Sequence, residues 1–241
     1  LYGRTIFHSI RKFIVFQLTV NLGATGISFI GPFIGVDSPV TVTQMLWVNI
    51  IMDTLGALAF ASEPPLLEYM RSMPKSRDES ILSVPMLKKV LINGAFILFL
   101  CVWFLKSDTL CMILHRSNEG YLLSAFFAML CFMCIFVCFV SRTERLNIFA
   151  NISKNLSFIL IMMLIAIVQI CFIYFSGDIF RCIPLSIHDL ISTILISSSV
   201  VIFDFLRKLV SKLIRLKRGE YISENSHSIE VSNNWRKENA R

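Results

Sequence analysis

Six long apolar runs constrain most strongly what this chain can fold into. They lie at about 13–31, 43–61, 87–105, 121–140, 156–175 and 187–206. Each is close to the ~20 residues with which an α-helix crosses a hydrocarbon core of ~30 Å. Only 16% of the 241 residues are charged, whereas soluble domains average about 25%. The runs therefore predict an all-α fold, a polytopic membrane bundle of six transmembrane helices.

Turn residues separate the first runs. Between the first and second runs, Ser38 followed by Pro39 predicts a helix N-cap and the first helical position. Pro64 and Pro65 predict the end of the second helix, because proline lacks the amide hydrogen that a continuing helix needs. The chain begins at Leu1 without an initiator methionine, so we expect a further segment to precede it.

Basic residues gather on one side of the predicted helices. Up to residue 218, seventeen Lys and Arg lie at the run ends and connections of that side, and three lie on the other. The positive-inside rule then places both termini in the cytoplasm. The net charge of +7 thus reflects orientation in a membrane, and the partner it predicts is membrane lipid. The chain has no interleaved aromatic and basic platform for nucleic acid.

The second run carries an acid, Asp53, which we identify as the only acid deep within any run. An acid at the centre of a membrane helix costs about 2.5–3.5 kcal/mol, and such residues usually face a partner or a water-filled path. Asn49 precedes Asp53 by four residues, so the two share a helix face. Asn21 lies midway along the first run. Thr54 and Gly56 predict a local unwinding that would free backbone carbonyls.

A carboxylate together with amide oxygens is a hard set of ligands. It suits calcium, suits magnesium less well, and does not suit copper or zinc. The alternative is that these polar groups hold helices together without binding an ion. The residues alone leave both interpretations open.

Two segments resemble a known family. GRTIFHSIRKFIVFQLTVN (3–21) and QMLWVNIIMDTLGALAFASEPP (44–65) are similar to the C-terminal membrane region of P-type calcium ATPases, particularly the plasma-membrane type. The resemblance is specific over about 1–90, and over the last four runs mainly hydropathy and spacing match. It implies that the six runs are helices five to ten of a ten-helix pump.

The resemblance also implies three parts: 1–12 as a cytoplasmic stalk, 13–206 as the six-helix transmembrane domain, and 207–241 as a basic amphipathic segment and disordered cytoplasmic tail. The D-K-T-G-T phosphorylation sequence of the family is not among the 241 residues. ATP and magnesium would therefore bind only in domains outside this chain, which should not hydrolyse ATP alone. Its partners would include those cytoplasmic domains and the first four helices of the pump.

In the family, the calcium ligands on these helices fall on Asn21, Asn49 and Asp53. The carboxylate matching Asp53 is a principal ligand, and Asn49 would give its amide oxygen. Ala24 and Met52 stand where the sarcoplasmic-reticulum type has an acid and a threonine, which leaves its second calcium site unsupported. The plasma-membrane type carries one calcium ion per cycle. Asn21 is therefore expected to be a near neighbour of the site and not a direct ligand.

Three further features have competing interpretations. Cys131, Cys134 and Cys138 share one helical stripe and predict small apolar packing, not a soft-metal site. Cys111 and Cys182 both fall in outward loops, where a disulfide between them is an alternative to free thiols. The basic amphipathic stretch 205–218 predicts anchoring to anionic lipid, with calmodulin binding as the alternative.

The resulting prediction is the membrane portion of an ATP-driven pump that exports calcium from the cytoplasm, with part of the ion site on the first two helices. It would lie in the plasma membrane or in an intracellular vacuolar membrane. Two alternatives remain open: a truncated, non-transporting regulator of a pump, and a non-enzymatic cation channel built from the six helices.

Overall fold

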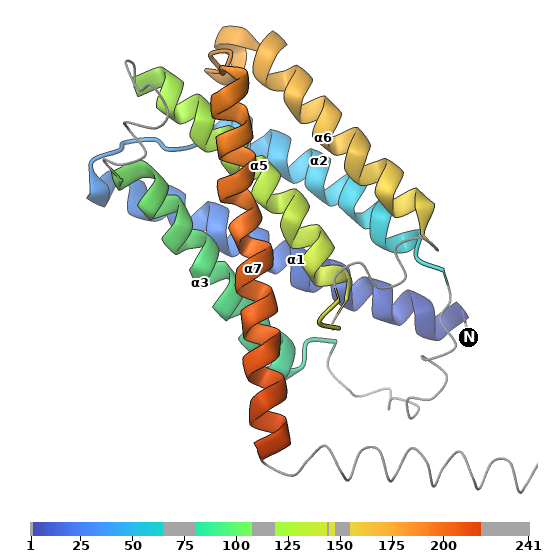
Figure 1. Ribbon diagram of the computed structural model, residues 1–241. Helices are drawn as coiled ribbons and strands as arrows, with labels where there is room; N and C mark the ends of the chain where they lie inside the picture. Colours follow the sequence, from blue (N-terminus) through green and yellow to red (C-terminus); the bar gives the residue numbers. More distant parts are fainter. Residues whose placement is uncertain (1, 65–80, 108–118, 144, 148–154, 218–241) are drawn as a thin grey trace, which may run out of the picture.

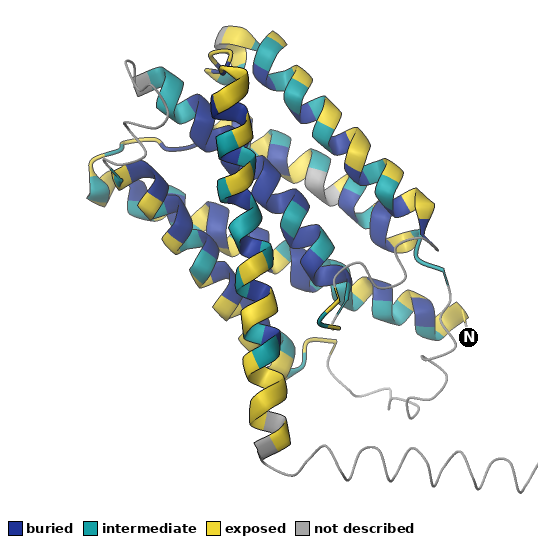
Figure 2. Cartoon of the chain, in the orientation of Figure 1, coloured by how far each residue is buried: buried dark blue, intermediate teal, exposed yellow. Residues whose placement is uncertain are grey.

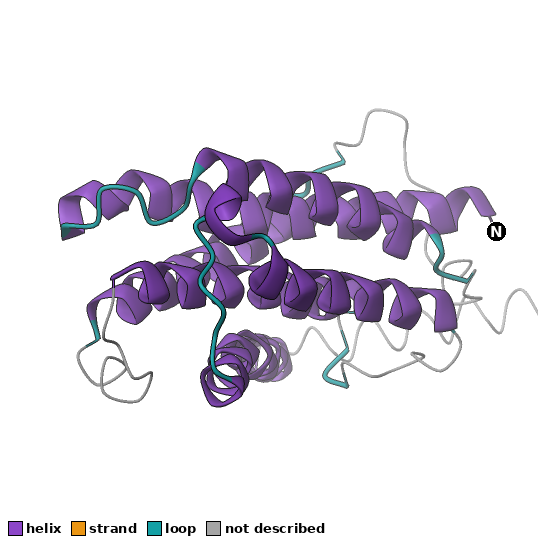
Figure 3. Cartoon of the chain, turned by 90° about the horizontal axis from the view of Figure 1, so that it is seen from above, coloured by secondary structure: helices purple, strands orange, loops and turns teal. Residues whose placement is uncertain are grey.

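A computed structural model describes residues 2–64, 81–107, 119–143, 145–147 and 155–217. These residues form six helices long and apolar enough to cross a membrane, and no strand occurs among them (Figure 3). The predicted six-helix, all-α fold is confirmed. The helices are α1 (Tyr2–Ile30), α2 (Val42–Ala61), α3 (Val84–Lys106), α5 (Glu119–Arg142), α6 (Leu156–Phe175) and α7 (Ile187–Lys217), with short 3₁₀ helices η1 (Gly31–Ile34) and η4 (Gly177–Phe180).

The bundle is arranged around α5. This helix packs against α1, α2, α3, α6 and α7, and its most extensive contact is with α7. On the other side, α1 packs most extensively against α3, and α2 against α1 and α6 (Figure 1). Figure 2 shows α5 buried along its length, while α6 and α7 each have an exposed side. Exposed apolar side chains on the outer helices suit a lipid surrounding.

Successive long helices run in opposite directions, which gives the bundle two ends. At one end of the bundle α1, α3 and α6 begin, and α2, α5 and α7 terminate. We call it the proximal end. The other, where η1 and η4 lie, is the distal end (Figure 1). The beginning of the chain and the end of the described part of α7 are therefore both proximal.

The start of α2 is set by Thr41, not by Ser38 and Pro39. The Thr41 side chain accepts a hydrogen bond from the Gln44 amide at 3.2 Å, and the Gln44 side chain accepts one from the Thr41 amide at 2.9 Å. This capping box satisfies two amides that a helix N-terminus otherwise leaves unpaired. The prediction of an N-cap at Ser38 was wrong because the pattern Thr-x-x-Gln, three residues later, offers the stronger cap.

Two helices extend beyond the apolar runs that predicted them. α1 is continuous from Tyr2, so the described part of the predicted stalk belongs to the same helix as the first span. α7 continues past 206 to Lys217 without interruption. The division at 1–12, 13–206 and 207–241 stays a prediction, and residues 218–241 lie outside the described part of the chain.

Glycines bring α1 and α3 close together. A Cβ added at Gly23 would lie 2.4 Å from Ile97 Cγ2, and one added at Gly94 would lie 2.5 Å from Leu22 Cδ2. Real Cβ atoms do not approach other atoms so closely, so only glycine allows this contact. Small residues have this role at many membrane helix interfaces.

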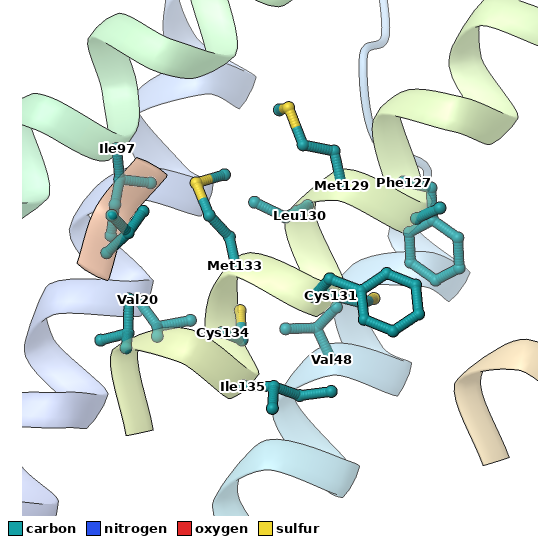
Figure 4. Packing of buried hydrophobic residues seen from close by; sticks show 14 of the residues in the cluster. Val20, Val48, Ile97, Phe127, Met129, Leu130, Cys131, Met133, Cys134 and Ile135 are labelled. Atoms are coloured by element: carbon teal, nitrogen blue, oxygen red, sulfur yellow. The ribbon is translucent and has the colours of Figure 1, made fainter. Parts of the chain in front are cut away.

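The cysteine stripe of α5 lies in the apolar core. Cys131, Cys134 and Cys138 are each at most 3% exposed and belong to one cluster of buried apolar residues. Figure 4 shows Cys131 and Cys134 among side chains such as Val20 of α1 and Val48 of α2. This environment supports their interpretation as small apolar packing residues.

Cys182 lies between η4 and α7, outside the membrane-spanning helices. Its thiol is buried and free, and burial raises the pKa of that thiol above its ordinary value. A raised pKa keeps the group protonated and poorly reactive at neutral pH. Cys111, the predicted alternative partner of a disulfide, lies outside the described residues, so that pairing stays untested.

Candidate ion site

The candidate ligands on α2 lie near the middle of a membrane span. α2 has 20 residues, and Asp53 is about 16 Å from its start and about 12 Å from its end at 1.5 Å per residue. The backbone of Asp53 is helical, whereas its side chain is outside what the structure describes. Asn49 lies one turn towards the distal end and is exposed. Both positions are therefore remote from the two ends of the helix.

Contacts between α1 and α2 place Asn21 at the same depth. Phe16 of α1 meets Gly56 of α2, where an added Cβ would lie 3.1 Å from the ring. Asn21 follows Phe16 by about 7.5 Å along α1. Asp53 and Asn49 precede Gly56 by about 4.5 and 10.5 Å along α2. The helices run in opposite directions, so all three displacements point to the distal end. The half-buried Asn21 is thus level with the two α2 positions.

One face of α2 has no cover from the described helices. Leu46, Asn49, Ile50, Thr54 and Leu58 are exposed. On a helical wheel, position 53 falls within this face, between positions 49 and 46. Exposed leucine and isoleucine are ordinary for a helix in lipid. An asparagine exposed at mid-span is not, because its amide would lack hydrogen-bond partners in hydrocarbon.

The predicted unwinding after Asp53 is wrong. α2 is continuously helical from Val42 to Ala61, through both Thr54 and Gly56. Gly56 instead permits the close approach of the Phe16 ring described above. In this structure the backbone carbonyls of the segment therefore stay within helical hydrogen bonding, and side-chain oxygens are the ligands that α2 can offer.

Aromatic contacts pack α2 against its neighbours towards each of its ends. The rings of Phe16 and Phe60 are 5.8 Å apart, and Phe158 of α6 lies 6.2 Å from Phe60. Towards the distal end, Trp47 stacks on Phe172 of α6, with ring centroids 3.7 Å apart. These aromatic contacts hold α2 against α1 and α6, so the uncovered face carrying Asn49 has a defined direction.

A polar contact to α6 also lies in the distal half of α2. Trp47 Nε1 donates to Gln169 Oε1 at 3.4 Å, and Gln169 is only 3% exposed. Sequence reasoning did not single out Gln169, although it is the one strongly polar residue in an otherwise apolar run. Its partner comes from α2, which explains why an amide is tolerated there.

A second buried acid, Asp204 of α7, was missed. It is 0% exposed and lies close to the end of the sixth predicted run (187–206), so it is deep within the bundle although not deep within the run. Arg207 Nη2 lies 2.6 Å from its Oδ1 and Lys208 Nζ lies 2.7 Å from its Oδ2. Asn93 of α3 also donates to Oδ1, at 3.3 Å. The cations at i+3 and i+4 were the sequence signal that could have identified this cluster.

Lys208 also completes the end of α5. Its Nζ donates to the carbonyl of Thr143 at 2.7 Å and lies 3.5 Å from that of Val140. These carbonyls lack helical partners because the helix ends there, and a cation suits the negative end of its dipole. Asp204 and Lys208 therefore have structural partners, whereas Asn49 has none among the described residues.

The chain contributes an incomplete set of ligands for a hard cation. Among the described side chains, to which that of Asp53 does not belong, no three His, Cys, Asp or Glu lie so that they could hold a metal ion. Asn21 and Asn49 are level with Asp53 and offer amide oxygens, which suit calcium. This arrangement can supply one wall of an oxygen-lined site. The further ligands of such a site would come from outside the described helices.

The chain matches known proteins over most of its length. The family described as "Cation transporting ATPase, C-terminus" matches residues 37–210. A rice protein named "Probable calcium-transporting ATPase 8, plasma membrane-type" is 34% identical over 204 residues, which cover 83% of this chain and 20% of the relative. The Caenorhabditis elegans "Plasma membrane calcium-transporting ATPase mca-1" is 31% identical over 247 residues, covering 94% of this chain and 19% of the relative.

A mammalian relative gives the same picture. The Bos taurus "Plasma membrane calcium-transporting ATPase 4" is 34% identical over 199 residues, covering 78% of this chain and 16% of the relative. The chain thus spans about one fifth of the length of the relatives that it matches.

Proposed function

Because this chain belongs to the cation-transporting P-type ATPases, as the C-terminal membrane region of a plasma-membrane-type calcium pump, we propose that it forms one wall of a calcium path through the membrane. Asp53 and Asn49 bind the ion, and Asn21 lies beside them at the same depth. The observation that carries the proposal is Asn49, a polar residue exposed at mid-span on a face that the described helices leave uncovered.

The chemistry of these residues supports calcium as the ion. Calcium takes six to eight oxygen ligands and accepts carboxylate and amide oxygens together. This chain offers one carboxylate and two amides at one level, which is too few for a complete shell. The remaining ligands come from helices that precede this chain in the pump and cover the open face of α2.

The placement of charge supports an orientation of the path, along which the proposed direction of transport is export. The basic residues lie mainly at the proximal end, which the positive-inside rule places in the cytoplasm together with both termini. Calcium enters the path from that side and leaves at the distal end. ATP and magnesium act in cytoplasmic domains outside this chain, in the plasma membrane or a vacuolar membrane.

The connection between those domains and the ion is helix α1. It is a single helix of 29 residues, so a displacement at Tyr2 is transmitted towards Asn21 without an intervening loop. Lys12 pairs with Glu63 just after α2, with Nζ and Oε2 2.5 Å apart. Movement of the stalk therefore acts on both α1 and α2, as alternating access requires.

The end of α7 has a separate expected role. In the described part of the stretch 205–218, apolar residues such as Val210, Leu213 and Ile214 are about half exposed on a helix that also carries Lys212. This arrangement supports anchoring to anionic lipid, and calmodulin binding remains the alternative that a binding assay would reveal.

The test is calcium transport by a complete pump in which this chain supplies the C-terminal helices. Asp53→Asn should abolish ATP-driven calcium uptake into inside-out vesicles, since the neutral amide loses the charge that holds a divalent ion. Asn49→Ala should weaken the apparent calcium affinity and leave some transport. Asp37→Asn is the matched control, because Asp37 is exposed in the connection between α1 and α2, and it should transport normally.

Two outcomes would contradict the proposal. Undiminished transport by the Asp53→Asn pump would remove Asp53 from the site. Calcium flux through the 241-residue chain alone, reconstituted without ATP, would favour the cation-channel alternative.

A further inference from the structure

The start of α2 is joined to the distal connection between α6 and α7. Gln44 lies in the first turn of α2 and is only 2% exposed. Its Nε2 donates a hydrogen bond to the carbonyl of Phe180 in η4 at 2.7 Å, while its Oε1 accepts one from the Thr41 amide at 2.9 Å. One buried amide group therefore both caps α2 and ties it to a segment 136 positions away.

Aromatic rings surround this junction. Trp47 follows Gln44 by three residues and stacks on Phe172 of α6. The ring of Phe180 meets both rings edge-on, with centroids 6.0 Å from Trp47 and 4.3 Å from Phe172. We call Gln44, Trp47, Phe172 and Phe180 the distal clasp. Figure 1 shows α2 and α6 side by side. Rings that keep water from a hydrogen bond strengthen it, because the surroundings then have a low dielectric constant.

The segment that the distal clasp holds is itself fixed to α5. The carbonyl of Arg181 accepts a hydrogen bond from the buried hydroxyl of Ser124 at 3.1 Å, and the Ile183 amide donates to the same hydroxyl at 2.8 Å. The hydroxyl of Tyr121, on the same helix, accepts one from the Ser186 amide at 2.9 Å. Since α5 is the buried centre of the bundle, the distal end of α2 is fastened to its least exposed part.

The proximal end of α2 has a different partner. There Glu63 pairs with Lys12 of α1, and this pair joins α2 to the stalk. The proximal contact of α2 with α6, between the rings of Phe60 and Phe158, is apolar. Apolar burial is not directional, so this contact tolerates a change in the tilt of α2. The hydrogen bond of Gln44 has narrow limits of distance and angle, so it fixes the distal end.

We propose that the distal clasp is the pivot on which α2 tilts, and that Gln44 is a positioning residue for calcium transport. The inference rests on the proposed function, in which the stalk moves α1 and the pair of Lys12 and Glu63 draws the proximal end of α2 with it. Because the distal clasp holds the other end against α5 and α6, α2 changes its tilt instead of following α1 as a body.

The position of Asp53 on α2 gives this tilt its effect. Asp53 lies about 13.5 Å from Gln44 and about 12 Å from the end of the helix, so it moves about half as far as the proximal end. Asn21 lies on α1, which moves with the stalk. The two residues therefore change their relative position in each transport cycle, and a site that binds and then releases an ion needs such a change. Without the pivot, α1 and α2 would move together and these residues would keep their spacing.

The experiment measures the number of calcium ions transported per ATP hydrolysed by the complete pump in inside-out vesicles. Gln44→Met keeps a side chain of similar length but cannot donate to Phe180. The ratio should fall about twofold or more, since loss of one hydrogen bond shifts an equilibrium by about two- to tenfold. The ratio does not depend on how much pump has folded, because calcium transport and ATP hydrolysis come from the same active molecules.

A second variant separates the clasp from the helix cap. In Gln44→Glu the carboxylate still accepts from the Thr41 amide, as in a capping box, but it has no hydrogen to donate to Phe180. The ratio should fall in this variant as well. It keeps the start of α2 intact, so it tests the pivot even if Gln44→Met does not fold.

Two matched controls leave the distal clasp in place. Thr41→Val removes the hydroxyl that accepts the Gln44 amide, which weakens the cap but keeps the bond to Phe180. Tyr174→Phe removes a hydrogen bond of 2.9 Å that α6, not α2, makes to the Leu185 carbonyl in the same connection. Both controls should transport as many calcium ions per ATP as the unmodified pump.

The inference fails if the two Gln44 variants keep the ratio of the unmodified pump. It also fails if Thr41→Val lowers the ratio as much, because a weaker helix start would then be sufficient. Asp53→Asn in the same assay distinguishes these failures from that of the proposed function. Lost transport by Asp53→Asn together with a normal ratio for both Gln44 variants overturns the pivot alone, whereas undiminished transport by Asp53→Asn overturns the calcium site.

Discussion

Two acids inside the apolar spans lie in regions that differ in what surrounds them. Asp204 is 0% exposed, and Arg207, Lys208 and Asn93 surround its carboxylate. Asp53 lies on an α2 face where a second polar residue, Asn49, is exposed. The region of Asp204 is complete within this chain, and that of Asp53 is open.

The difference indicates how an intramembrane charge is used. A buried acid whose opposite charges come from the same chain holds helices together, here α3, α5 and α7. The side chain of Asp53 lies outside what the structure describes, and for an acid on a face that the described helices leave uncovered we expect the partner to be an ion, another part of the pump, or both. The following changes test this contrast, in order of decreasing expected effect.

The largest effect is expected from Asp204→Ala. This change leaves the buried Lys208 and the partly buried Arg207 without their carboxylate, and breaking a buried pair costs about 3–5 kcal/mol. Denaturation of the chain in detergent micelles, followed by circular dichroism, should show this loss. Asp53→Ala should cost little stability in the same assay. An equal loss for both acids would remove the contrast and make Asp53 a structural residue.

A smaller effect is expected at the interface of α1 and α3. Gly23→Ala places a Cβ about where Ile97 already lies, with 2.4 Å between them, and overpacking of this kind costs about 1–3 kcal/mol. The melting temperature in micelles should fall. Gly3→Ala is the matched control, since nothing lies within 4 Å of a Cβ added there, and it should be neutral or slightly stabilising. A neutral Gly23→Ala would mean that α1 and α3 can separate freely.

The smallest effect is expected on the packed side of α2. Trp47→Phe removes the hydrogen bond to Gln169, which is 3.4 Å long, and a typical hydrogen bond contributes about 0.5–1.5 kcal/mol. Ring stacking on Phe172 should persist, so the loss should stay near 1 kcal/mol in the denaturation assay. Calcium transport by the complete pump should change little. Lost transport would show that the covered side of α2 also forms part of the ion path.

Helix existence was predictable from this sequence, whereas helix limits were less so. Each apolar run was long enough to require a membrane span, and all six became helices. The start of α2 was placed at Ser38 and lies at Thr41, because the reciprocal bonds of Thr41 and Gln44 outweigh the preference of a single Ser-Pro pair. Continuation of α7 beyond 206 was not anticipated as one helix.

The candidate site was predictable only in part. The spacing of Asn49 and Asp53 placed them on one face from sequence alone. The depth of Asn21 relative to them required the contact between Phe16 and Gly56. The predicted unwinding at Thr54 failed because glycine in a helix can serve close packing as well as flexibility, and only the neighbouring helix distinguishes the two uses.

By itself, the sequence determined that the chain crosses a membrane six times and carries a costly acid at the middle of its second span. Those properties depend on hydropathy and spacing within about 20 residues. Only the tertiary structure decided which polar residues have partners. Asn93 and Asp204 are 111 positions apart, and Trp47 and Gln169 are 122 positions apart. Contacts over such separations depend on how the helices pack, because apolar side chains that merely face lipid and those that form an interface look alike in a single sequence.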